Sequence, residues 1–111
     1  MENLAAGFIE VFGFVTAIKA ADAAAKAADV RIVALDTTKP AAGDAAAVPL
    51  VVIIKLEGSV SAVNAAVDAG VRQANLCAGV ITHHVIARPD DETEKLMKLT
   101  NVGRDKIRKK N

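Results

Sequence analysis

The chain has 111 residues, of which 52% are hydrophobic and 24% charged, and its formal net charge at pH 7 is +1. This length fits one domain with one modest core rather than two independent domains. The near balance of charge excludes an electrostatic argument for nucleic-acid binding by the body of the protein.

The composition also bears on the core and on the compartment. Alanine supplies much of the apolar content, and because it buries little area per residue we expect a thin core that contacts between subunits supplement. The single cysteine excludes an internal disulfide framework. No run of about 18 apolar residues and no signal-like N-terminus is present, so we expect a soluble cytoplasmic protein without membrane contacts.

The first half of the chain predicts a strand, a helix and a second strand. Residues 5–12 alternate loosely, which favours a strand buried on at least one face. Residues 14–28 predict an amphipathic helix whose apolar positions recur every three or four residues: Val15, Ile18, Ala21, Ala25 and Ala28. The β-branched residues within 30–35 predict the second strand. A long loop, 37–49, follows, because its glycine and two prolines do not suit a strand.

The second half repeats this order. Residues 50–56 predict a third strand, and Ser59 is a suitable N-cap for a helix that runs to about residue 76. The inner stripe of this helix is predicted to contain Val60, Val63, Val67, Val71 and Ala74. Gly79 ends the helix, and residues 80–87 predict a fourth strand. A short helix over 90–99 is expected, capped by Asp90 or Asp91.

An internal repeat decides the fold class. The segment GFVTAIKAADAA from Gly13 resembles GSVSAVNAAVDA from Gly58, about 45 residues further along. Each copy lies between two predicted strands, so the expected fold is a ferredoxin-like α/β sandwich (split βαβ) with a four-stranded antiparallel sheet. We expect a domain over 1–99 and a basic, solvated tail over 100–111 that contains Arg104, Lys106, Arg108, Lys109 and Lys110.

No catalytic residues, metal ligands or cofactor motif can be assigned. His83 and His84 are adjacent on a predicted strand, so they point to opposite faces, and we expect one of them to be a half-buried packing or hydrogen-bonding residue. Cys77 is expected to be a small apolar filler. Lys39 and Asp44 could contact a polar solute, but a solvated pair is the simpler interpretation.

Two long segments nevertheless resemble a known family. GFIEVFGFVTAIKAADAAAKAADVRIV begins at Gly7, and EGSVSAVNAAVDAGVRQANLCAGVITHHVIARP begins at Glu57. Together with the start of the acidic helix that follows, they resemble the shell proteins of bacterial microcompartments, whose small domain forms flat hexagonal tiles. The resemblance covers about residues 5–99 and leaves out the central loop.

The resemblance implies a cyclic homo-hexamer with a pore on its axis, tiled with other shell proteins around encapsulated enzymes, which are candidate partners. It places Lys26 and Arg88 at the hexamer edge, where they would contact the neighbouring tile. It also places the loop between the second and third strands at the pore. The pore residues implied here are Thr37, Thr38, Lys39, Pro40, Ala41, Ala42, Gly43, Asp44 and Ala45.

Two departures limit what can be carried over from the family. Ala87 replaces the first proline of the family's PRP motif, and the loop at 37–49 is longer than the family's usual glycine-rich loop. Six longer loops could plug the opening, form a collar on one face or be disordered. The competing hypothesis is a ferredoxin-like regulatory module, dimeric or trimeric, whose loop folds over a small ligand; an enzyme is a distant third.

Overall fold

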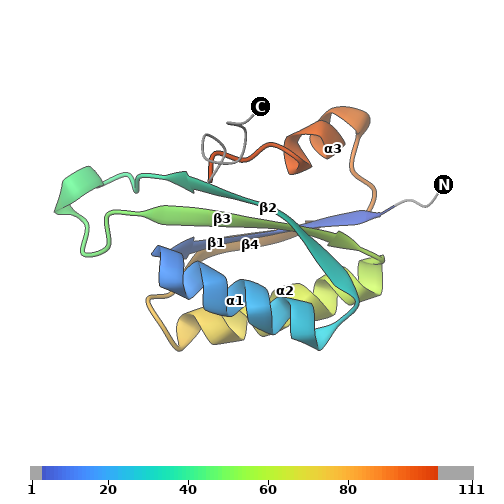
Figure 1. Cartoon of the computed structure of the whole chain (residues 1–111), viewed down its shortest axis with the longest axis horizontal. Coiled ribbons are helices and arrows are strands. Elements are labelled where there is room, and N and C mark those ends of the chain that lie inside the picture. Colours follow the sequence, from blue (N-terminus) through green and yellow to red (C-terminus); the bar gives the residue numbers. More distant parts are fainter. Residues whose placement is uncertain (1–3, 103–111) are drawn as a thin grey trace, which may run out of the picture.

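The computed structural model describes residues 4–102 and shows one twisted sheet with helices on both faces (Figure 1). The strands follow the order β2-β3-β1-β4, and every neighbouring pair is antiparallel. The predicted split βαβ fold is therefore confirmed. The elements are β1 (Ala5–Phe12), α1 (Phe14–Ala27), β2 (Val30–Thr38), a short 3₁₀ helix (Gly43–Ala45), β3 (Val51–Gly58), α2 (Val60–Asn75), β4 (Val80–Ile86) and α3 (Asp91–Met97).

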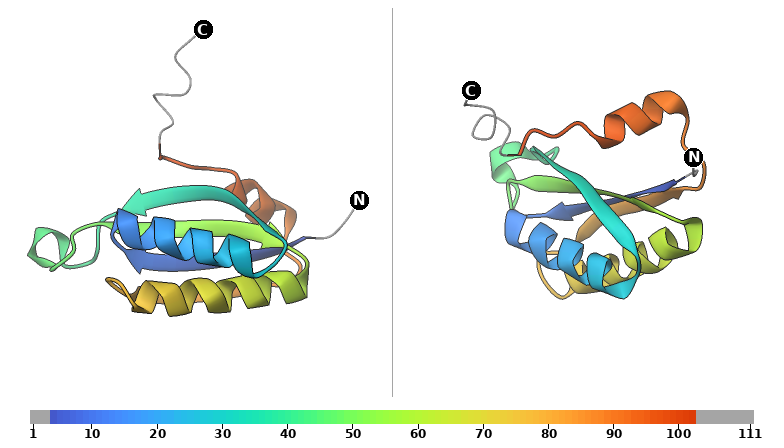
Figure 2. Two further views of the ribbon diagram at one scale, coloured as in Figure 1. Left: turned by 60° about the horizontal axis from the view of Figure 1, so that its bottom comes forward. Right: turned by 45° about the vertical axis from the view of Figure 1, so that its right-hand side comes forward.

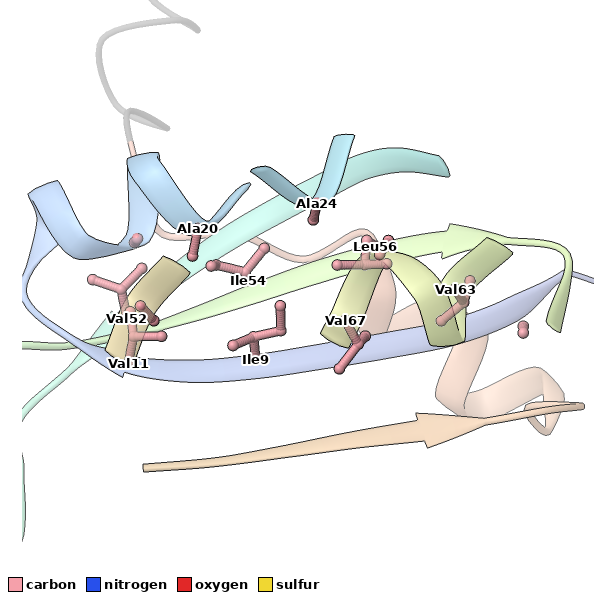
Figure 3. Close-up of a cluster of buried hydrophobic side chains, with 13 residues drawn as sticks. Ile9, Val11, Ala20, Ala24, Val52, Ile54, Leu56, Val63 and Val67 are labelled. Atoms are coloured by element: carbon pink, nitrogen blue, oxygen red, sulfur yellow. The ribbon is translucent and has the colours of Figure 1, made fainter. Parts of the chain in front are cut away.

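The core lies between the sheet and the two long helices. Helices α1 and α2 pack side by side against one face of the sheet, whereas α3 lies over the opposite face (Figures 1 and 2). Alternate residues of the two central strands point into the layer of helices, as expected for strands with one face in the core. Figure 3 shows the buried side chains that meet there, which include Ile9, Val11, Ile54 and Leu56 from the strands and Ala20, Ala24, Val63 and Val67 from the helices.

Gly70 allows the two long helices to approach one another closely. A Cβ atom at this position would lie 2.7 Å from Cδ1 of Ile9 and 3.2 Å from the carbonyl oxygen of Ala20. Any side chain at this position, where α2 meets both α1 and β1, would require Ile9 or the helix backbones to shift. Because Ala20 and Ala24 face this contact from α1, the helix pair is joined through small residues, which bury little area each.

The structure corrects the predicted inner face of α1. Val15 and Ile18 are 69% and 48% exposed, while the buried residues of the helix are Thr16, Ala17, Ala20 and Ala24. An alanine-rich helix offers more than one apolar stripe, so periodicity alone did not select the correct one. The close contact with α2 selects the stripe with the smaller side chains.

In α2 the prediction is largely confirmed. Val63, Val67 and Ala74 are buried, and Val71 packs against the core from its edge. Val60 is 43% exposed because it is the first residue of the helix, beyond the edge of the core. The predicted cap is confirmed as well, since the Ser59 side chain accepts a hydrogen bond from the backbone N–H of Ala62 at 3.2 Å.

Several element ends differ from the predictions. Strand β2 continues to Thr38, because Asp36, Thr37 and Thr38 pair with residues of β3; Thr37 and Thr38 are therefore strand residues rather than loop residues. Helix α3 ends at Met97, and Asp90 caps it by accepting from the N–H of Glu92 at 3.1 Å. The basic residues predicted for the tail, 104–110, lie outside the described residues.

Replacing Gly70 with Val should destabilise the fold. The added side chain must displace Ile9 or push α2 away from α1, and overpacking of this kind costs about 1–3 kcal/mol. The control is Ala65→Val on the exposed side of the same helix, which should cost only about 0.5 kcal/mol of helix propensity. Denaturant midpoints of the two variants measure the difference, and equal midpoints would contradict the close contact.

Candidate functional site

The loop that joins β2 to β3 projects beyond the end of the sheet (Figures 1 and 2). None of the residues 39–50 is buried. The loop is nevertheless folded upon itself: the N–H of Gly43 donates to the carbonyl of Pro40 at 2.9 Å, and the N–H of Ala46 donates to the carbonyl of Gly43 at 3.1 Å. Gly43 has a φ of 58°, which a glycine adopts without strain. The loop is thus an exposed, locally structured protrusion.

The two charged side chains of the loop form a weak, solvated pair. The distance from Nζ of Lys39 to Oδ1 of Asp44 is 3.9 Å, and both side chains are largely exposed. Exposed pairs of this kind contribute little to stability, because water and salt screen the attraction. The two opposite charges leave the loop without net charge.

Lys26 lies in the last turn of α1 and points into solvent. Its Nζ lies 2.8 Å from Oδ2 of Asp22, one turn earlier in the helix. The hydrogen bond that Lys26 donates to Asp22, together with the negative charge of that carboxylate, raises the pKa of Lys26 above the usual lysine value. The ammonium group is therefore charged at neutral pH and accessible to a partner.

Arg88 follows β4 and is also exposed. The strand register places Arg88 relative to the loop. Ile86, at the end of β4 next to Arg88, is opposite Ala6 at the start of β1. Val51, where the loop enters β3, is opposite Phe12 at the other end of β1. Helix α1 leads into the start of β2, which lies opposite the end of β3. Lys26 and Arg88 thus belong to one end of the sheet, and the loop belongs to the opposite end.

The expectations for the histidines and the cysteine are wrong for this chain. His83 and His84 are both exposed on β4, an edge strand of the sheet. Cys77 follows α2 in an exposed turn and fills no part of the core. Among residues 4–102, no group of three or more His, Cys, Asp or Glu side chains could hold a metal ion, and none of the helices there has the length and apolar character to cross a membrane.

The sequence patterns missed a polar cluster between the sheet and the C-terminal end of α3, centred on Lys55 in the middle of β3. The Nζ of Lys55, a residue of β3 that is 7% exposed, lies 2.6 Å from Oδ2 of Asp36 in β2. The same nitrogen donates to the carbonyls of Leu96 at 2.8 Å and of Leu99 at 2.9 Å. Three ammonium hydrogens thus meet three acceptors. The only signal in the sequence was a lysine within an otherwise apolar run of a strand.

The chain is similar to shell proteins of carboxysomes and other bacterial microcompartments. It is 38% identical over 108 residues to the carboxysome shell protein CsoS1C of Hydrogenovibrio crunogenus, covering 94% of each chain. It is 38% identical over 96 residues to the carboxysome shell protein CcmK2 of Synechococcus elongatus, covering 85% of each. The microcompartment shell protein EutK of Escherichia coli is 42% identical over 93 residues, which cover 84% of this chain and 51% of EutK.

A solved structure shares the fold. A crystal structure of a microcompartments protein from Desulfitobacterium hafniense matches with a TM-score of 0.67 and 24% identity, covering 87% of this chain and 48% of that one. The family model for the BMC domain matches residues 5–89. This match spans most of the chain, and it agrees with the shell proteins CsoS1C and CcmK2, which align over most of both chains. The chain therefore belongs to the BMC-domain family of shell proteins.

Proposed function

We propose that this chain is a structural subunit of a bacterial microcompartment shell and assembles as a cyclic homo-hexamer. In that ring the loop at 39–50 surrounds the central opening, while Lys26 and Arg88 contact neighbouring hexamers. The observation that supports this arrangement is that the loop lies at one end of the sheet and both charged residues at the other. A subunit in a ring must present one end to the axis and the opposite end to the periphery.

The surface of the single chain supports assembly. Large apolar side chains are exposed on several elements, among them Phe14, Ile18, Leu76 and Ile81. A thin core leaves a small domain with modest stability, so burying such residues between subunits would add to it. In a ring the contact is heterologous, because one surface of each copy meets a different surface of the next, and no active site is needed to close it.

The loop supports a steric rather than an electrostatic control of passage. Each copy contributes one lysine and one aspartate, so six copies around an axis would cancel in net charge. Small side chains make up most of the remainder, including the alanines at 41, 42, 45, 46 and 47. The size of the opening would then depend on how the loops are held.

The assembled mass tests the proposal. Size-exclusion chromatography with light scattering should report a mass about six times the 11.5 kDa of the chain, or larger sheets and tubes built from such rings. The regulatory-module alternative expects a dimer or trimer instead. A stable species of three copies or fewer at high protein concentration would refute the hexamer.

Replacing Lys26 with Ala should leave the hexamer intact and impair its assembly into sheets. The substitution removes an exposed charge without disturbing the core, so the fold of the subunit should be retained. Electron microscopy of negatively stained samples measures sheet formation. Lys19→Ala is the matched control, since Lys19 is an exposed lysine of the same helix, and unchanged sheets in Lys26→Ala would remove the edge role.

Deleting residues 41–47 should change solute passage while preserving the hexamer. The removed residues are not buried, so their loss costs little packing energy. Passage can be measured as the rate at which a small substrate reaches a reporter enzyme enclosed in reconstituted shells. The control is the full-length variant Asp44→Ala, which keeps the loop length and, like the deletion, leaves Lys39 as the one charged residue of the loop. If the deletion prevents folding, the loop is structural rather than a gate.

A further inference from the structure

The residues that follow α3 lie against the base of the loop. We call residues 96–101 the strap; they comprise the last two residues of α3 and the segment after it, which runs along the outer side of β2 on the face of the sheet opposite α1 and α2 (Figures 1 and 2). The strap is far from the loop in sequence: Asn101 and Thr37, which are hydrogen bonded, are separated by 64 residues. It nevertheless touches the last residues of β2, from which the loop departs.

One side chain of the strap substitutes for a missing strand. The Oδ1 of Asn101 accepts from the backbone N–H of Thr37 at 2.8 Å, and its Nδ2 donates to the carbonyl oxygen of the same residue at 2.9 Å. Thr37 lies on an edge strand, so without Asn101 both groups would face away from β3 with no strand to pair with. The amide of Asn101 therefore supplies the pairing that a neighbouring strand would provide.

Further contacts hold the strap in register with β2. The backbone N–H of Asn101 donates to Oδ1 of Asp36 at 2.9 Å, and the hydroxyl of Thr100 donates to the carbonyl of Leu35. The other oxygen of Asp36 is paired with Lys55, which also holds the carbonyls of Leu96 and Leu99. Asp36 thus contacts both residues that hold the strap: one of its oxygens is paired with the buried Lys55, and the other accepts from the backbone N–H of the exposed Asn101.

The two ends of the loop are fixed in different ways. The returning end is held by an internal strand, since β3 pairs with both β1 and β2, and Leu50 accepts a hydrogen bond from the N–H of Gly13 at 2.8 Å. The departing end belongs to β2, which pairs only with β3. The strap is the second partner of β2 at this point, so the departing end depends on it.

We infer that Asn101 and Lys55 are positioning residues for the loop: they fix the place where it leaves the sheet. In the proposed shell subunit they would set how far each loop reaches into the central opening, and in that respect the inference rests on the proposed function. The local effect does not require a hexamer. Releasing the strap should free the departing end of the loop, because local opening follows the loss of hydrogen-bonded anchors.

Hydrogen exchange followed by mass spectrometry tests this inference on the full chain. Asn101→Ala removes all three side-chain hydrogen bonds to Thr37, including the one that the Thr37 hydroxyl donates at 3.3 Å, from an exposed position, so the fold should be retained. Amide exchange in peptides that cover residues 37–50 should accelerate about tenfold, while exchange in β1 and α2 stays unchanged. Asn64→Ala, at an exposed asparagine of α2 that bonds within its own helix, is the matched control and should leave the loop unaffected.

Lys55→Met provides a second test, because methionine retains much of the apolar stem and removes the three bonds of the ammonium group. It should accelerate exchange both in the strap and in residues 37–50.

If Asn101→Ala accelerates exchange only in residues 96–102, the strap serves only to hold α3, and the inference is wrong. A uniform acceleration across the chain would also overturn it, since that would report general destabilisation. Light scattering on the same samples reports the assembly state separately, so failure of the hexamer proposal can be told apart from failure of this one.

Discussion

The close approach of α1 and α2 across Gly70 is the constraint on which the rest of the molecule depends. It requires small residues on both helices, so Ala20 and Ala24 face inward while Val15 and Ile18 face solvent. A core built in this way is thin, and it leaves apolar side chains on the surface of the single chain. The close contact between the two helices therefore also favours association between copies, because association would bury the apolar side chains that the thin core leaves exposed.

The antiparallel register then gives the subunit two different ends. The connection from α1 to β2 and the residues after β4 lie at one end of the sheet, at its two opposite edges. The long connection between β2 and β3 emerges at the other end. A sheet is stiff compared with its loops, so events at the loop need not disturb Lys26 or Arg88. In the proposed hexamer this separation would let the central opening and the outer edge vary independently.

Sequence periodicity and the internal repeat were sufficient to predict the order of elements, the antiparallel sheet and the buried face of α2. They were insufficient for α1. The repeat implies that α1 and α2 bury equivalent faces, but α1 buries Ala17, Ala20 and Ala24. Each of these residues lies one position before the corresponding apolar residue of the predicted stripe. Exposure of Cys77 and His84 depends on what lies across from them in space, which no local pattern records. The pairing of Asn101 with Thr37 is equally invisible, since it joins residues from opposite halves of the chain.

The strap explains how an exposed loop can have a defined position. The loop buries none of its side chains, and its only ion pair is weak, so its placement must come from its two ends. The returning end inherits order from an internal strand, but an edge strand alone would fray before Thr38. Asn101 prevents this by completing the pairing of Thr37, and Lys55 secures the strap from the buried side. The geometry of the loop is thus determined by residues that lie outside it in sequence.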